Sequence, residues 1–176
     1  VDPPNTLLTY SNYSYDLAGR LIEIVSGESY DQYIAKHILE PLEMNSSSVT
    51  APIPQSLLDR LATSYTHGED GFLPITDVLY RSDISAGGLT TTAEDMANFL
   101  IAHLQNGRFG NSRILQEETA KLMHAQHFTN EPSLPGYTYG FYERSDNGRR
   151  ILMHGGGLRD AASLAVLLPE EGVGFF

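Results

Sequence analysis

The stretch TYSNYSYDLAGRLIEIVSG, residues 9–27, decides the fold because it joins a run of polar residues to the start of a helix. From Asp16 onward its apolar residues recur at helical spacing, which predicts a helix over about residues 15–26. Ser14 is expected to cap the start of this helix, and Gly27 is expected to end it.

Tyr10 and Asn12 stand just before the predicted helix. In extended chain, residues i and i+2 point to the same side, so this phenol and this amide are expected to converge on one site. An unperturbed phenol has a pKa of about 10, and nearby cations lower that value enough for proton transfer. The alternative is structural: Tyr10 would be a packing aromatic and Asn12 a turn former.

The composition sets limits on the class of protein. The chain has 176 residues, 41% of them hydrophobic, which is enough for one domain with a core. With 22 acidic against 11 basic residues it has no basic patch, so nucleic acid is not expected as a partner. The absence of Cys excludes disulfides, thiolate catalysis and Cys-bound zinc. No apolar run reaches the roughly 18 residues of a membrane span, and both ends are expected to be cut from a longer chain.

Further helices are predicted along the first two thirds of the chain. A second helix should begin after Ser29 and end near Glu40, because the residue before a proline avoids helical angles. A short helix is expected over residues 55–62, and a long irregular segment over residues 64–85. Two more helices are predicted, one that starts at Thr92 and ends near Gly107, and one within residues 114–127.

The last third of the chain has the pattern of an antiparallel sheet. Aromatic residues alternate over residues 137–141, which predicts a strand. Asn147-Gly148 is a strong hairpin turn, and residues 161–168 and 173–176 read as two further strands. The predicted fold class is therefore α+β, with a helical region over about residues 1–130 followed by strands over about residues 136–176.

His154-Gly155-Gly156-Gly157 lies at the end of the predicted return strand. Glycines in a strand mark close approach of a backbone or a ligand, and exposed N–H groups there can face a developing oxyanion. A histidine beside them can act as a cation or a proton shuttle near neutral pH. The alternative is a glycine-rich bend with an incidental histidine.

Together, Tyr10-Ser11-Asn12 and His154-Gly155-Gly156 resemble the second and third motifs of the serine β-lactamase and penicillin-binding protein superfamily. The likeness is to the class C β-lactamase branch, which includes esterases and D-aminopeptidases. It implies a partial β-lactamase/transpeptidase-like fold in which residues 1–176 are the C-terminal part of one catalytic domain. It also implies a periplasmic or extracytoplasmic protein that needs no cofactor and no metal, with an ester, amide, β-lactam or D-amino-acid peptide as substrate.

The resemblance also implies roles for the motif residues. Tyr10 would be the general base, Asn12 would bind the substrate amide, and His154 would assist proton transfer or bind substrate. Gly155, which stands where many relatives have a threonine, and Gly156 would lie beside the substrate. The N–H of Gly157 would form half of the oxyanion hole.

The first motif of the superfamily, Ser-x-x-Lys, is missing from the chain. No serine here has a lysine three positions later, so the nucleophile is expected upstream of Val1 and the chain alone is expected to be inactive. Two alternatives remain. One is a non-catalytic penicillin-binding-like module, and the other is a metal-dependent hydrolase, suggested by His124 and His127 although the spacing of these residues is not that of H-E-x-x-H.

Overall fold

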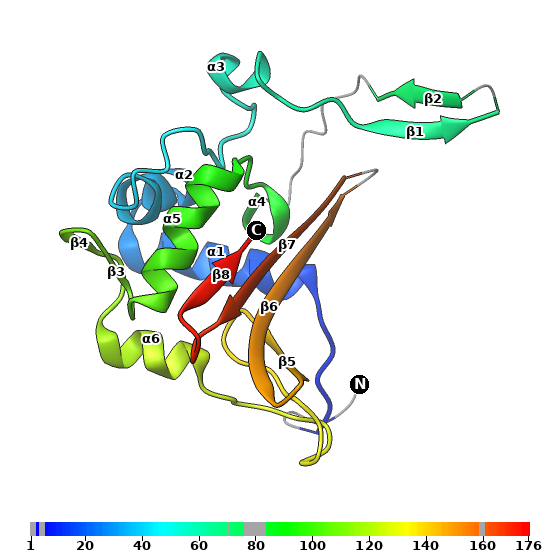
Figure 1. Cartoon of the computed structure of the whole chain (residues 1–176). Coiled ribbons are helices and arrows are strands. Elements are labelled where there is room, and N and C mark those ends of the chain that lie inside the picture. Colours follow the sequence, from blue (N-terminus) through cyan, green and yellow to red (C-terminus); the bar gives the residue numbers. More distant parts are fainter. Residues whose placement is uncertain (1–2, 4–5, 70, 76–83, 159–160) are drawn as a thin grey trace.

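The computed structural model describes residues 3, 6–69, 71–75, 84–158 and 161–176. Helices lie against an antiparallel sheet of four strands, as the α+β prediction required (Figure 1). The sheet has the order β5-β6-β7-β8, so neighbours in space are also neighbours in sequence. These strands are β5 (Tyr142–Asp146), β6 (Arg149–Leu158), β7 (Ala161–Leu168) and β8 (Val173–Phe175).

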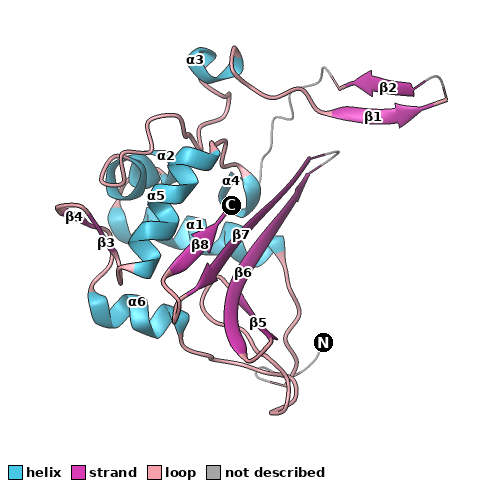
Figure 2. Ribbon diagram, viewed as in Figure 1, coloured by secondary structure: helices cyan, strands magenta, loops and turns pink. Residues whose placement is uncertain are grey.

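The predicted helices are present in the predicted order, with shorter bounds for most of them, and the short helix α4 was not predicted (Figure 2). They are α1 (Asn12–Ser26), α2 (Tyr30–Ile34), the π-helix η1 (Ala35–Leu39), α3 (Gln55–Leu58), α4 (Ile84–Gly87), α5 (Ala93–Leu104) and α6 (Glu117–His124). Gly27 ends α1 in the left-handed conformation, as predicted. The start of α1 was wrong: Ser11 is the N-cap, and Ser14 lies inside the helix.

Two predictions of local structure were wrong. Part of the segment 64–85 forms a hairpin of β1 (Tyr65–Gly68) and β2 (Gly71–Pro74), which projects from the body of the molecule (Figure 1). Residues 70 and 76–83 of that segment lie outside the described residues. Residues 137–141 form no named strand, since only Tyr137 makes isolated bridges and the ladder begins at Tyr142. A second small hairpin joins β3 (Arg108–Phe109) to β4 (Ser112–Arg113).

The core lies between α5 and one face of the sheet. Leu152 of β6 and Leu167 of β7 are cross-strand partners and are fully buried. Met96 and Leu100 of α5 belong to the same cluster, on the face that the helical spacing predicted. Thr92 caps α5 by accepting a hydrogen bond from the Asp95 N–H at 3.2 Å.

Helix α1 packs through a small residue, whereas α5 packs through its apolar residues. Gly19 is buried, and a Cβ there would lie 2.4 Å from the Ser85 hydroxyl of α4. The Ser85 hydroxyl donates to Asp16 at 3.0 Å, which fixes α4 against α1. No helix within the described residues is long and apolar enough to cross a membrane.

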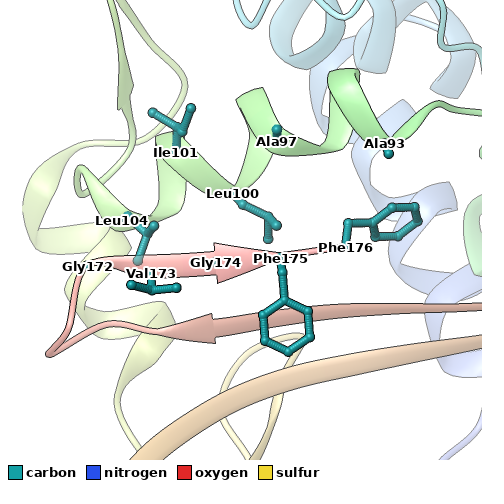
Figure 3. Close-up of a pocket in the computed structure, with 10 residues that line it drawn as sticks. All are labelled: Ala93, Ala97, Leu100, Ile101, Leu104, Gly172, Val173, Gly174, Phe175 and Phe176. Atoms are coloured by element: carbon teal, nitrogen blue, oxygen red, sulfur yellow. The ribbon is translucent and has the colours of Figure 1, made fainter.

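An apolar groove of about 360 Å³ lies between α5 and β8 (Figure 3). Leu100 and Leu104 of α5 face the strand, and Val173 lies at its start. Every residue that lines the groove is apolar or glycine, so this groove offers no side chain for acid, base or nucleophilic chemistry.

Candidate active site

The β5–β6 hairpin sets the position of His154. Asn147 and Gly148 both adopt positive φ, 50° and 75°, as a two-residue hairpin turn of this kind requires. The turn pairs Asp146 with Arg149, and the register then places Tyr142 opposite Met153. Since β5 begins at Tyr142, His154 is the first residue of β6 beyond the β5 ladder.

Among the described residues, no strand pairs with β6 beyond His154 on the side away from β7, so this part of its edge is open. A two-residue turn makes Asp146 and Arg149 a hydrogen-bonded pair, and such pairs alternate along an antiparallel ladder. The alternation directs the N–H and C=O groups of Met153 to β5, and those of Gly155 and Gly157 to the same side, where β5 has ended. These groups are therefore placed to bind an extended substrate.

Tyr10 approaches this edge from the segment before α1. The Leu8 N–H donates to the Asn130 side chain at 3.0 Å, which ties the segment to the loop after α6. The ring centroids of Tyr10 and His154 are 6.0 Å apart. The structure thus brings together two of the predicted site residues that are 144 positions apart in sequence.

Two further tyrosines surround His154. Tyr15, in the first turns of α1, lies 6.1 Å from the His154 ring and 5.6 Å from the Tyr10 ring, measured between centroids. The ring centroids of Tyr142 and His154 are also 6.1 Å apart. Burial, and secondarily the neighbouring Tyr10, raises the pKa of the Tyr15 phenol. Tyr15 therefore stays protonated and neutral at physiological pH.

A cavity of about 260 Å³ lies among these rings. The side chains of Tyr10, Tyr15, Tyr142 and His154 contribute to its lining. The remaining lining residues are Leu8, Thr9, Ser11, Ser14, Tyr137, Thr138, Gly140 and Phe141. The lining residues include hydroxyl groups and an imidazole, which are groups that transfer protons and position carbonyl substrates.

Asn12 is not part of this cavity lining. It is exposed on the first turn of α1, because the helix begins at Asn12 itself. The prediction that Tyr10 and Asn12 point to one side assumed extended chain through Asn12, whereas Ser11 is extended and the helix begins at Asn12.

The three glycines after His154 have different surroundings. A Cβ at Gly156 would lie 2.5 Å from the Ser163 hydroxyl of β7, so the neighbouring strand favours glycine there. A Cβ at Gly157 would meet nothing within 4 Å. At Gly155 the nearest atom would be the Tyr142 hydroxyl, at 3.4 Å. Among the three, Gly157 therefore has open space on the side where a side chain would project.

A half-buried ion pair joins the two strands of the hairpin. Arg150 of β6 pairs with Glu143 of β5 through its Nε at 2.8 Å, and Glu143 also accepts from the Gly136 N–H at 3.0 Å. Burial raises the pKa of the Glu143 carboxyl, but hydrogen bonds from Gln126, Arg150 and Gly136 outweigh it and lower the pKa overall. The loop before β5 is thereby fixed to the hairpin that carries His154.

The histidines considered as metal ligands have structural contacts. His124 is buried and hydrogen-bonds the His103 ring at 3.0 Å, while His127 contacts the Leu122 carbonyl and stacks on Tyr139. Within the described part of the chain, no group of three or more His, Asp or Glu residues is placed to hold a metal ion. His124 thus contributes to the packing between α5 and α6.

Sequence reasoning missed Tyr15 and Tyr142 as site residues. The position of Tyr142 could have been predicted from the sequence. A two-residue turn at Asn147-Gly148 places Tyr142 opposite Met153, and Met153 is the residue before His154. The signal for Tyr15 was weaker, since its position depends on how α1 packs.

A tyrosine before a helix, facing the open glycine-rich edge of an antiparallel sheet, is the arrangement expected of serine β-lactamases and penicillin-binding proteins. The β-lactamase family model matches residues 1–176, and the chain belongs to that family. Penicillin-binding protein 4 of Amycolatopsis lactamdurans is 33% identical over 129 residues, which are 70% of this chain and 33% of that protein.

Solved structures agree with this assignment. The octameric penicillin-binding protein homologue from Pyrococcus abyssi superposes with a TM-score of 0.80 at 26% identity, over 99% of this chain and 39% of that one. A class C β-lactamase from Rhodobacter sphaeroides gives 0.75 at 20% identity, over 94% of this chain and 53% of that one, and shows the shared fold. The chain spans about a third of the length of the curated relatives it matches.

Proposed function

We propose that this chain supplies the tyrosine and histidine side of a serine hydrolase site that acts through an acyl-enzyme on esters, amides or β-lactams. The observation that carries the proposal is the approach of Tyr10 to His154 beside the open edge of β6, with 6.0 Å between ring centroids. Membership of the β-lactamase family supports the same reaction class.

In the proposed reaction, Tyr10 accepts the proton of a serine hydroxyl as the serine oxygen attacks the substrate carbonyl carbon. The Gly157 N–H stabilises the oxyanion. The bond to the leaving group then breaks, the leaving group takes the proton, and an acyl-enzyme remains for hydrolysis by water. His154 assists these proton transfers or binds substrate, and Asn12 contacts the substrate amide.

The nucleophile is proposed to come from a Ser-x-x-Lys segment outside these 176 residues, because none of their serines has a lysine three positions later. The chain alone should then form no covalent adduct with a fluorescent penicillin or an activated ester, whereas the full-length protein should. Mass spectrometry after incubation measures this difference. A stable adduct on a serine of the chain would overturn the assignment of the nucleophile.

The same experiment separates the enzyme from a non-catalytic penicillin-binding-like module, for which the absence of Ser-x-x-Lys from the chain is the supporting observation. A full-length protein that binds the penicillin reversibly, forms no adduct and turns over no ester would support the module.

We further propose that neutral esters and amides are better substrates than carboxylate-bearing β-lactams. His154 offers an imidazole rather than an ammonium group, and Gly155 offers no hydroxyl. Losing a hydrogen bond to a charged group costs about 1.5–3 kcal/mol, or roughly one to two decades in kcat/KM. His154→Lys in the full-length protein should raise kcat/KM for nitrocefin by about that factor relative to a short p-nitrophenyl ester, and an unchanged ratio would contradict the preference.

A further inference from the structure

The hydroxyl of Tyr142 lies beside Gly155, at the open edge of β6. A Cβ added at Gly155 would have the Tyr142 hydroxyl as its nearest neighbour, at 3.4 Å. The Tyr142 ring also lines the cavity that contains Tyr10 and His154. Tyr142 is only half-buried, so its phenol borders both the cavity and the edge where the backbone groups of Gly155 are unpaired with β5.

The register explains this placement. Tyr142 is the first residue of β5 and pairs with Met153, two residues before Gly155. A substrate that lies along the edge of β6 at Gly155 and Gly157 would occupy the line along which β5 would have continued. One end of that substrate would then meet Tyr142, which stands where the ladder stops.

The polarity of the cavity identifies the group that Tyr142 would meet. Among the described residues that line it there is no Lys, Arg, Asp or Glu. The hydrogen-bonding side chains that this chain contributes are hydroxyls and one imidazole, so beside Tyr142 a neutral acceptor fits better than a carboxylate, which would lose its hydration without a Lys or Arg of this chain to replace it.

We propose that Tyr142 is a specificity-determining residue, whose phenol donates a hydrogen bond to a neutral carbonyl group in the part of the substrate that lies beside Gly155. This inference rests on the proposed serine hydrolase function and deepens it by naming the substrate feature. Tyr142 takes no part in proton transfer at the reacting carbon.

The test uses full-length protein and two thioesters with the same acyl group. One leaving group is methyl mercaptoacetate, which carries a neutral carbonyl, and the other is butanethiol, which carries none. Thiol release is measured with a disulfide reagent, to which these 176 residues contribute no background because they contain no cysteine. Within each variant the ratio of the two kcat/KM values is compared, so the difference in thiol leaving ability cancels.

Tyr142→Phe should lower kcat/KM for the carbonyl-bearing thioester about 3- to 10-fold, the effect of one neutral hydrogen bond, mainly through KM. The butanethiol ester should change less than about 2-fold, because it presents no acceptor to the phenol. The matched control is Tyr139→Phe, which removes a hydroxyl from an exposed ring that stacks on His127 outside the cavity. This control should leave both values unchanged.

Gly155→Thr in the Tyr142→Phe background should restore part of the lost discrimination. The new side chain would start at ordinary contact distances, 3.8 Å from the Ser163 carbonyl and 3.9 Å from Leu164 Cδ1, and would return a hydroxyl to the same place. Equal losses for both thioesters, or no loss, in an active protein would overturn the role of Tyr142. A wild-type protein that turns over neither thioester and forms no acyl-enzyme would overturn the proposed function and this inference together.

Discussion

Helices α1 and α5 have similar apolar stripes in sequence, but the stripe is buried in α5 and exposed in α1. In α5, Met96 and Leu100 are 7% and 3% exposed, because β7 and β8 lie against that face. In α1, Leu17 and Ile24 are 60% and 66% exposed, and the contact face is the one that carries Gly19. An amphipathic pattern predicts a helix, but the elements available to pack against it decide which face is covered.

The difference separates chemistry from stability. The start of α1 carries the tyrosines beside His154, whereas α5 and the sheet bury the largest apolar side chains. Substitutions at the start of α1 should therefore change catalysis and leave folding intact, and substitutions in the α5 region should do the reverse. Four experiments on the full-length protein test this division.

The largest effect is expected from Tyr10→Phe. If Tyr10 is the base, removing its hydroxyl should lower kcat about 10²- to 10⁴-fold, the usual contribution of general base catalysis. The free energy of unfolding should change by less than about 0.5 kcal/mol, because the exposed ring is retained. Tyr13→Phe, at a more exposed position of α1 outside the cavity, is the control and should change neither kcat nor the free energy of unfolding. Near-normal turnover of an activated ester by the Tyr10 variant would return Tyr10 to a packing role.

Leu152→Ala should have the converse effect. Leu152 is fully buried opposite Leu167, so its truncation should lower the free energy of unfolding by about 2–5 kcal/mol, measured by urea denaturation. The kcat measured well below the melting temperature should stay within about 2-fold, because Leu152 does not line the cavity. Leu122→Ala, at an exposed position of α6, is the control with an expected change below about 1 kcal/mol. Equal stability losses for the two variants would contradict the position of the core.

The His103–His124 pair should make the α5 region sensitive to acid. Burial, and secondarily His124, lowers the pKa of His103 to about 4, while burial and then Arg150 lower that of His124. Because the folded protein resists protonation, stability is complete above the unfolded pKa of about 6.5 and is lost as pH falls toward 4. Between pH 7 and 5 the expected loss from His103 is about 2 kcal/mol.

His103→Gln keeps a donor for the His124 ring and removes one titrating group, so it should flatten the pH dependence of urea unfolding between pH 7 and 5. Leu122→Ala, at an exposed position of α6 without a titrating group, should leave the pH dependence as it is in the wild type. If His103→Gln loses as much stability between pH 7 and 5 as the wild type, the acid-sensitive group is not His103.

The smallest effect compares the two helix caps. Thr92→Ala removes the hydrogen bond to the Asp95 N–H and should cost about 1 kcal/mol of stability. Ser11, the N-cap of α1, makes no such side-chain bond, so Ser11→Ala should cost less than about 0.5 kcal/mol. Both values come from urea unfolding. Equal costs would mean that the two caps do not differ in solution as they do in this structure.

Local sequence was sufficient to predict turns and helix ends at positions where few residue types fit the backbone conformation. Gly27 ends α1 and Asn147-Gly148 turns the hairpin because positive φ strongly favours these residues. Thr92 caps α5 for an equally local reason. The strands that the turn joins, and the position of His154 at the end of one of them, follow from the period of two along a strand.

Other features depended on partners distant in the chain. The aromatic alternation of residues 137–141 predicted a strand, but Phe141 is buried in the core and Gly136 is fixed to Glu143, so the ladder begins only at Tyr142. The segment 64–85, predicted to be irregular, contains a hairpin that is defined by the pairing of β1 with β2. The sequence of this segment showed no strand periodicity. His124 packs against His103 because α5 and α6 are adjacent in space, which the spacing of His124 and His127 did not show.

The sequence by itself determined the family, the main helices, the last strands of the sheet, and the two motifs at Tyr10 and His154. Those features are encoded in neighbouring residues, through turn chemistry, periodicity and motif spacing. Only the tertiary structure decided which residues share the site: it placed Tyr15 and Tyr142 around His154 and left Asn12 exposed at the start of α1. The physical reason is that side-chain direction depends on the exact start of a helix and the exact end of a ladder, where a shift of one residue turns a side chain away from its neighbours.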